Sequence, residues 1–560
     1  MQIEKGGSYI ASLASQMISY PLEHIIDHGY VVDNMDEKAI LAKLDAMNIE
    51  NARILFVDEK VKTDKKTKYF EAPYSVSKIT TEQKQRWLDF SKNPELKLPE
   101  LNPYFATDFS LNAVDKSRTM PKLIEQQQGT QIYAMPSHYF GDEPKVALLA
   151  GLKIMPEVID LKQGVSAVLL TYMADLARTK LAFQSSVAGL SFSPRVSENG
   201  LGFYLEGYTQ HILRFLQDSV KNFSEFELTE SFLNQAKERY IEALDRLDKE
   251  SAARQAGNAI SQFASYPYFE IDKAREMVKQ ITISDVKFIR EKLLTQATSL
   301  RLLSVGNLSD EQVKALATEI TKLVKNNNTA LDYGRYLDIN QSQRKLNYVK
   351  QIPHEDNAFT ISYFAHNIPE LEGRAQSILL RDVISRWYFD DLRTDKQLGY
   401  AVYARRDSIG KTSGIQFLVQ SPTASPKTIM EHNQRFIQES LEKLKKMSAD
   451  EFEKYRASLL ERLQHKPESL AEEFEEFSGD FALGNDKFDR KAQLIAKIKE
   501  TRQQDVIDFY QSTIVKQKGL VFASQAIGTN KAINQAAELN GFEKVESIEK
   551  LQREFELKPY

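Results

Sequence analysis

The chain has 560 residues, 42% of them hydrophobic and 27% charged, a composition typical of folded globular proteins rather than of disordered chains. Its formal net charge of -4 argues against a nucleic-acid-binding protein, and no apolar run approaches the ~20 residues that a membrane-spanning helix needs. The sequence contains no cysteine, which excludes disulfides, thiol catalysis and cysteine-ligated zinc. The length predicts roughly three to four domains.

The first part of the chain is too short in regular elements to fold alone. Residues 35–47 predict a helix and residues 52–57 an alternating strand. A single helix and strand bury too little surface for an independent core. We therefore interpret residues 1–65 as the C-terminal part of a preceding repeat; the alternative is an extension docked on the first full repeat. Residues 66–100, with a short helix at 81–91, are interpreted as a linker between two halves.

The rest of the chain contains an internal repeat. Residues 187–192 match residues 397–402 at an offset of 210, and each copy follows a helical pattern and opens a predicted hairpin. Later helices and closing strands also correspond. The sequence predicts an α+β fold of two full homologous repeats, each an antiparallel sheet packed by helices. Their bounds are 101–325 and 340–530, and residues 531–560 form a charged, partly helical tail.

The nearest approach to a metal-binding motif is His24-Ile25-Ile26-Asp27-His28. Two histidines four residues apart could share a helix face and hold zinc, as in the inverted zincin motif His-x-x-Glu-His. Pro21 and Gly29 flank the motif and disfavour a helix there, and no distal Glu on a matching helix is evident. We expect no metal ligands in this chain and interpret His24 and His28 as surface residues.

An acidic run occupies residues 471–477. Phe474 and Phe477 are three residues apart within it, which favours a helix whose acidic face is in solvent.

A stretch at 392–400 combines a cation and an aromatic at the end of a predicted amphipathic helix. The helix has apolar residues at core spacing: Leu380, Val383, Ile384, Trp387, Tyr388 and Leu392. Arg393 at its end suits the helix dipole, and Tyr400 opens the following strand. Spacing alone leaves two interpretations open. Arg393 is a helix cap and Tyr400 a strand residue, or the two side chains form a functional site.

The pattern Leu392-Arg393-Thr394-x-x-Gln397-Leu398-Gly399-Tyr400-x-Val402 resembles the signature of the last domain of the pitrilysin and insulin-degrading-enzyme family. The likeness is greatest to the bacterial pitrilysin branch. Other stretches resemble family landmarks in the same order: Ser19 to Glu23, Lys97 to Pro99, Phe140 to Lys145, Ala188 to Ser191, and Phe488 to Arg490.

The resemblance implies four homologous LuxS/MPP-like α+β domains, two in each half, around a closed chamber. It also implies a zinc metalloendopeptidase, of the inverzincin type, whose first domain carries His-x-x-Glu-His. By the same resemblance, Arg393 and Tyr400 bind substrate, Tyr400 also takes part in catalysis, and Phe389 lines the pocket beside them.

This sequence contains no His-x-x-Glu-His. The resemblance is therefore to the C-terminal, substrate-binding half, with no cofactor in this chain and zinc expected in an N-terminal half. The chain alone is predicted to be inactive. Its expected partners are peptide substrates and a catalytic N-terminal half, covalent or separate, and neither nucleic acid nor a membrane. The alternative is a non-catalytic partner subunit or peptide-binding scaffold of the same fold. The resemblance implies a periplasmic location, with the cytoplasm as the alternative.

Overall fold

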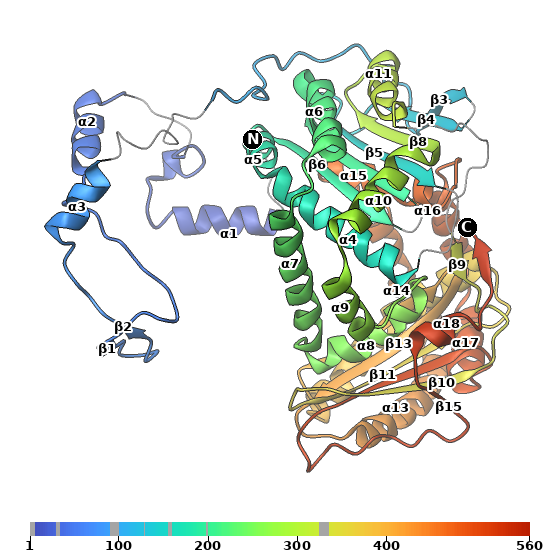
Figure 1. Ribbon diagram of the computed structural model, residues 1–560. Coiled ribbons are helices and arrows are strands. Elements are labelled where there is room, and N and C mark those ends of the chain that lie inside the picture. The colour runs from blue at the N-terminus through green and yellow to red at the C-terminus, as the bar shows by residue number, and fades with distance from the viewer. Residues whose placement is uncertain are drawn as a thin grey trace. The chain divides into compact units, whose positions relative to one another are not determined.

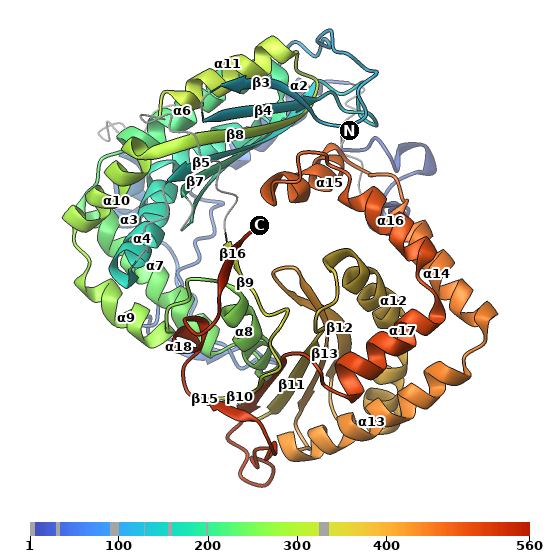
Figure 2. The ribbon, with the colours of Figure 1, turned by 90° about the vertical axis from the view of Figure 1, so that its right-hand side faces the viewer.

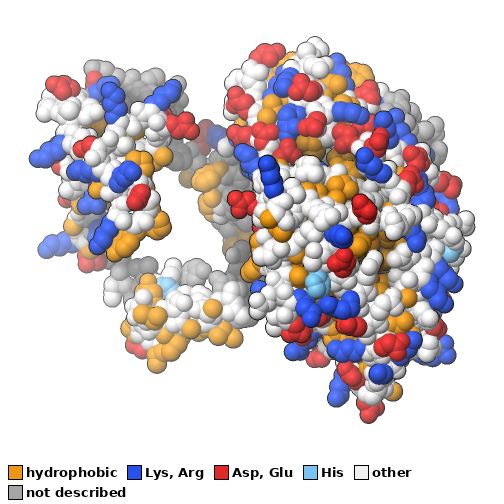
Figure 3. Space-filling model, turned by 90° about the horizontal axis from the view of Figure 1, so that it is seen from below, with side chains coloured by type: hydrophobic (Ala, Val, Ile, Leu, Met, Phe, Trp, Pro, Cys, Tyr) orange, Lys and Arg blue, Asp and Glu red, His pale blue; other side chains and the backbone are white. Residues whose placement is uncertain are grey.

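The computed structural model describes residues 6–29, 34–89, 100–127, 129–154, 160–197, 200–323 and 335–560. The chain divides into two compact units, Met1–Asn102 and Pro103–Tyr560 (Figure 1). Within the described ranges, no helix is long and apolar enough to cross a membrane. On the face shown in Figure 3, acidic and basic side chains are interspersed over the larger unit.

The first unit contains short elements only. They are α1 (Gly6–Gln16), the 3-10 helix η1 (Leu22–His24), α2 (Glu37–Ala46), β1 (Lys65–Lys66), β2 (Pro73–Tyr74) and α3 (Thr81–Leu88). The helix expected at 35–47 forms as α2, and the Asp36 carboxylate caps it by accepting the Ala39 N–H at 2.9 Å. The helix expected at 81–91 forms as α3, which ends at Leu88.

The strand expected at 52–57 is wrong. These residues have no regular structure, and Leu55 and Val57 are both 87% exposed. An alternating pattern makes a strand only when a neighbouring strand accepts its hydrogen bonds and covers its apolar face. No described segment of the first unit pairs with these residues.

The larger unit begins with a six-stranded sheet of order β3-β4-β8-β5-β7-β6. Its strands are β3 (Lys122–Gln127), β4 (Thr130–Met135), β5 (Lys145–Ile154), β6 (Leu190–Ser197), β7 (Gly200–Tyr208) and β8 (Ala297–Gly306). Its helices are α4 (Leu161–Ala177), α5 (Thr179–Val187), η3 (Thr209–His211), α6 (Ile212–Glu225), α7 (Glu230–Asp248), α8 (Ala252–Ala264), α9 (Ile271–Gln280), α10 (Ile283–Thr295) and α11 (Asp310–Thr321).

A second six-stranded sheet follows, of order β12-β13-β11-β14-β10-β15. Its strands are β10 (Lys345–Gln351), β11 (Asn357–Phe364), β12 (Ala401–Ile409), β13 (Thr412–Ser421), β14 (Val521–Ile527) and β15 (Glu543–Val545). Its helices are α12 (Glu370–Phe389), the π-helix η4 (Asp390–Asp395), α13 (Pro426–Lys446), α14 (Ala449–Leu463), α15 (Leu470–Ala482), α16 (Arg490–Glu500), α17 (Gln503–Tyr510), the π-helix η5 (Gln511–Val515) and α18 (Ile548–Gln552).

The two sheets share one topology over five strands. The order β4-β8-β5-β7-β6 corresponds to β10-β14-β11-β13-β12, and in each sheet the first of these pairs is parallel and the others antiparallel. The α+β class predicted from the repeat is therefore confirmed. The sixth strand differs, because β3 precedes β4 in sequence, whereas β15 comes from the chain end.

The last thirty residues are integrated into the second repeat. β15 pairs with β10, and β16 (Leu557–Pro559) pairs with β9 (Arg335–Leu337). α18 packs on α8, where the Gln552 side chain donates hydrogen bonds to the carbonyls of Gln262, Phe263 and Ser265. The C-terminal segment thereby caps the end of a helix from the first repeat.

The repeats exchange helices. α8 of the first repeat packs on β11, β13 and β14, and its Phe263 lies in a cluster with Phe364 and Phe522 of the second sheet. α15 of the second repeat packs on β5 and β8, where Phe474 and Phe477 join the core of the first sheet. Figure 2 shows α8 beside the strands of the second sheet. Each sheet is therefore covered partly by the other repeat.

The α15 contact corrects the expectation of a fully solvated acidic face. Glu473 is only 1% exposed, and its carboxylate accepts the Ser137 hydroxyl at 2.5 Å and the His138 N–H at 2.7 Å. A buried carboxylate is stable when hydrogen bonds replace its lost hydration. Its partners are more than three hundred residues away in sequence, so the local pattern could not reveal them.

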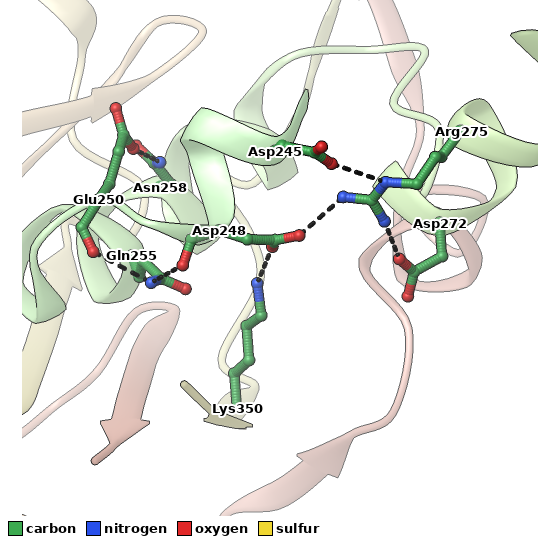
Figure 4. Close-up of polar contacts among 8 residues, drawn as sticks. All are labelled: Asp245, Asp248, Glu250, Gln255, Asn258, Asp272, Arg275 and Lys350. Atoms are coloured by element: carbon green, nitrogen blue, oxygen red, sulfur yellow. Dashed lines mark hydrogen bonds and ion pairs between the residues drawn. The ribbon is translucent and has the colours of Figure 1, made fainter. Parts of the chain in front are cut away.

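A network of charges ties α7 and α9 to the second sheet (Figure 4). Arg275 contacts three carboxylates, those of Asp245 at 3.2 Å, Asp248 at 2.7 Å and Asp272 at 2.6 Å. Asp248 also pairs with Lys350 of β10 at 3.3 Å. The repeats are thus joined by ion pairs as well as by exchanged helices.

Candidate functional site

The candidate site is built at the C-terminal end of α12. The side chains of Leu380, Val383, Ile384 and Tyr388 are fully buried on one face of this helix, and α12 packs on β12 and β13. The Tyr388 hydroxyl donates to the Asn433 side chain at 2.6 Å. This apolar face has the 3–4 spacing of an amphipathic helix. Its packing fixes the position of the residues that follow the helix, up to Tyr400.

The helix continues into the π-helical turn η4. Lys396 N–H donates to the Asp391 carbonyl at 2.9 Å, and Leu398 N–H donates to the Leu392 carbonyl at 3.0 Å. Leu392 is fully buried and Leu398 is 6% exposed, so both ends of the turn are held in the core. A π-helical turn inserts a residue into the helical repeat and is frequent at functional sites. Residues between the two leucines are displaced toward solvent.

Gly399 lets the chain pass close to β13. A Cβ atom at this position would lie 1.9 Å from the Gln420 carbonyl oxygen, well inside van der Waals contact. The reversal itself is made by Gln397, whose φ is 51°. Gly399 thus allows the close approach that brings Tyr400 to the start of the edge strand β12.

The structure brings the three predicted site residues together. The Arg393 guanidinium carbon lies 4.7 Å from the Phe389 ring centre and 4.9 Å from the Tyr400 ring centre. These distances are typical of cation–π contacts. Within the described ranges the guanidinium makes no hydrogen bond and no ion pair, so its N–H donors are available. The Tyr400 side chain is 86% exposed.

This geometry departs from the interpretation of Arg393 as a cap and Tyr400 as a strand residue. Among the described residues, Arg393 donates to no carbonyl at the end of α12. Tyr400 precedes β12, which starts at Ala401, and its ring packs on Arg393 rather than in the core. The arrangement places several N–H donors and one phenolic O–H donor close to one another, where a ligand could meet them.

The sequence did not predict the contacts that Asp391 of η4 makes with α13. Asp391 Oδ2 is buried without a hydrogen bond and lies 3.7 Å from the Arg435 guanidinium on α13. Arg435 in turn hydrogen-bonds the His432 ring at 3.0 Å. Burial, and then the nearby Arg435 charge, lowers the pKa of His432, which favours a neutral ring. The only signal in the sequence is an acidic residue two positions before Arg393.

The histidine pair of the first unit does not fit a zinc ion. His24 ends a 3-10 helix, and its Nδ1 atom lies 3.2 Å from Asp27 Oδ1. The His28 ring stacks on Tyr20 at 3.8 Å, and its buried Nδ1 has no hydrogen-bond partner. Nowhere in the described parts of the chain do three or more His, Asp or Glu side chains gather as a metal would need.

Two models of known protein families match parts of this chain. The model of the middle or third domain of peptidase M16 matches residues 2–277. The model of the C-terminal lobe domain 4 of PQQ synthase PqqF-like proteins matches residues 379–478, which include Arg393 and Tyr400. The chain belongs to the M16 peptidase family.

The resemblance to pitrilysin extends over the whole chain. Protease 3 of Escherichia coli (strain K12) is 30% identical over 551 residues, 98% of this chain and 57% of that protein. The crystal structure of pitrilysin superposes with a TM-score of 0.86 at 30% identity, covering 100% of this chain and 59% of that one. The fold is thus pitrilysin-like, as the signature at 392–402 predicted. The chain spans a little over half the length of these relatives.

More distant relatives share the same region. Insulin-degrading enzyme of Homo sapiens is 22% identical over 528 residues, 91% of this chain and 51% of that protein. A Pseudomonas fluorescens structure titled as a peptidase M16 inactive domain has a TM-score of 0.56 at 12% identity, covering 75% of this chain and 100% of that one. The latter likeness concerns the fold alone.

Proposed function

We propose that this chain is the substrate-binding half of a zinc metalloendopeptidase that degrades peptides in a closed chamber. The observation that carries the proposal is the Arg393 guanidinium in contact with both the Phe389 and the Tyr400 ring, with no hydrogen bond or ion pair to any residue in the described ranges. Membership of the M16 peptidase family supports the reaction class.

The three residues have distinct tasks in this proposal. The Arg393 fork donates hydrogen bonds to substrate carbonyl oxygens and holds the peptide beside the reacting bond. The Tyr400 hydroxyl donates a hydrogen bond to the oxygen on which negative charge develops as the carbonyl is attacked. Phe389 carries no donor. Its ring contact with the guanidinium restricts that group, so that the nitrogens are pre-oriented before substrate arrives.

Catalysis requires a second half that carries His-x-x-Glu-His, either covalently joined or as a separate chain. The bound zinc would supply a Lewis acid and an activated water there. The residues of this chain offer no matching ligand set in its described parts, and we assign them no step of that chemistry. A periplasmic compartment would follow the bacterial pitrilysin branch.

The test is an assay of a fluorogenic peptide with the chain alone and with a zinc-bearing M16 half added. We expect hydrolysis only in the mixture. Hydrolysis by the chain alone that survives replacement of His24 and His28 would contradict the need for a second half. Full rates with Tyr400→Phe and Arg393→Ala in the mixture would contradict the site assignment.

A second candidate is a non-catalytic partner subunit or peptide-binding scaffold. It is favoured by the fold-level likeness to the M16 structure titled as an inactive domain. The two candidates separate in one experiment. A scaffold binds peptides through Arg393 but gives no hydrolysis with any zinc-bearing half, whereas the proposed half-enzyme does.

A further inference from the structure

A cationic cavity lies at the opposite end of α12 from the candidate site. Its volume is about 630 Å³, it is open to solvent on one side, and it is bordered by the first turns of α12, the β12–β13 hairpin and the segment between α15 and α16. Three arginines from these separate elements line it, Arg374, Arg406 and Arg490, together with Lys411. Fold stability alone gives no reason to gather four cations around one cavity.

The positive charge in this cavity is only partly neutralised. Arg490 pairs with Glu370 at 2.9 Å and lies 3.8 Å from Asp480. Arg374 and Arg406 have no carboxylate within ion-pair distance in the described ranges. The Asp407 carboxylate beside Arg406 turns away and accepts the Ser362 hydroxyl at 2.6 Å.

Of the two arginines without a carboxylate partner, Arg406 is held in place by neutral groups. Arg406 Nε donates to the Ser377 hydroxyl and its Nη2 to the Ser413 hydroxyl, both at 3.2 Å. Burial, and then the nearby Arg374 charge, lowers the pKa of Arg406 to about 10. Arg374 Nε is buried without a hydrogen-bond partner, and burial followed by the Arg490 charge lowers its pKa.

Such an arrangement costs free energy unless a negative group enters. Confined like charges repel one another, and a buried donor without an acceptor loses its hydration without compensation. Guanidinium groups bind the paired oxygens of carboxylate and phosphate better than any other side chain does. We propose that this cavity is a binding site for an oxyanion, a carboxylate or phosphate group, held by Arg374, Arg406 and Lys411.

The position of the cavity indicates how a peptide could deliver the group. β12 is an edge strand of its sheet, and in the described parts of the chain it pairs with β13 alone, so no described strand occupies its outer edge. It starts beside Tyr400 and ends at Ile409, next to the cavity. Nine residues of strand span roughly 30 Å. A peptide held at Arg393 and Tyr400 could place a carboxylate in the cavity. For a peptide-borne anion, though not for a free one, the inference therefore rests on the proposed function.

Calorimetric titration of the full chain tests the site and distinguishes the two sources. The probes are inorganic phosphate, a peptide of about ten residues with a C-terminal carboxylate, and the same peptide amidated. We expect Arg374→Gln and Lys411→Gln each to weaken anion binding about tenfold. Lys427→Gln removes an exposed cation on α13 and should leave it unchanged.

The binding results distinguish a peptide-borne anion from a free one. Preference for the acid peptide over the amide supports a peptide-borne group, and phosphate binding without that preference supports a free anion. Arg374→Gln should not lower Tm, because it removes an unpaired cation; a fall in Tm with unchanged binding would mean that the arginine is structural. Absence of binding by every probe, or binding unaffected by both variants, overturns the proposal. Tyr400→Phe should leave phosphate binding unchanged, so failure of the peptidase proposal would not be mistaken for failure of this one.

Discussion

Each repeat contains a turn that leads from a helix into the edge strand of its sheet, and the two copies differ in what they expose. In the first repeat, α5 ends at Val187, Gly189 takes a φ of 72°, and Leu190 is 2% exposed in the core. In the second repeat, the helix gains a π-helical turn, the left-handed residue is Gln397, and the residue after the glycine is Tyr400, 86% exposed.

The difference shows how one duplicated scaffold takes on chemistry in a single copy. Both turns keep a glycine beside the edge strand, so the sheet and helix need not move. The π-helical turn between Leu392 and Leu398 displaces the segment that precedes the strand, so its arginine and tyrosine lie outside the core. A function added to a repeated fold is expected in such a local departure rather than in the shared framework.

The largest expected effect tests whether the exposed tyrosine does chemistry. With a zinc-bearing half supplied, Tyr400→Phe should lower kcat by about 10²–10³, since it removes one donor to a developing oxyanion. Tyr403→Phe is the matched control, because Tyr403 is also exposed on β12 but belongs to no cluster with Arg393. Steady-state rates on a fluorogenic peptide measure both. Equal rates for Tyr400→Phe and the parent would remove the tyrosine from the reaction.

The two turn glycines give a stability comparison. Gly399→Ala should lower the free energy of unfolding by about 3 kcal/mol, because the new Cβ would lie 1.9 Å from a backbone oxygen of β13. Gly189→Ala meets a Tyr208 ring carbon at 3.1 Å and adds strain at positive φ, which should cost about 1 kcal/mol. Denaturant unfolding measures the pair. A larger loss at Gly189 would contradict the role assigned to the close approach of Gly399.

Much of this comparison could be predicted from the sequence. The two glycines aligned at the offset of 210, and four of the apolar residues that marked the core face of α12, Leu380, Val383, Ile384 and Tyr388, are fully buried. Phe389 and Arg393 are four residues apart, the spacing at which helical side chains meet. The π-helical turn left no signal, because a one-residue insertion does not alter the apolar pattern before it.

Long-range partners account for what the sequence could not predict. The exchange of α8 and α15 between repeats, and the burial of Glu473 by Ser137, join segments whose local patterns are complete without each other. The strand expected at 52–57 failed for a related reason. Its alternation was real, but a strand is defined by its neighbour, and periodicity does not identify a neighbour.

The reverse substitution in the first repeat asks whether a tyrosine alone makes a site. Leu190→Tyr would place a hydroxyl in a core position that is 2% exposed, with no π-helical turn before it to carry the residue outward. We expect a loss of about 2 kcal/mol in the free energy of unfolding. Leu190→Met is the volume-conserving control, for which we expect less than about 1.5 kcal/mol. An unchanged stability for Leu190→Tyr would mean that the turn shared by both repeats lets a tyrosine reach solvent. The extra residue of the π-helical turn would then not be needed to expose Tyr400.

The smallest expected effect concerns Arg393. Whether KM or kcat changes matters more here than the size of the change. If the guanidinium grips substrate carbonyls throughout the reaction, Arg393→Gln should raise KM about tenfold and change kcat little, the pattern of uniform binding. Stability should change by less than about 1 kcal/mol, because only exposed cation–π contacts are lost. Arg386→Gln is the control, since Arg386 is exposed on the same helix and pairs with Asp390 at 3.5 Å. A fall in kcat with unchanged KM would instead place Arg393 in contact with the developing charge, and would make the second repeat's turn an oxyanion-binding element in which both side chains act.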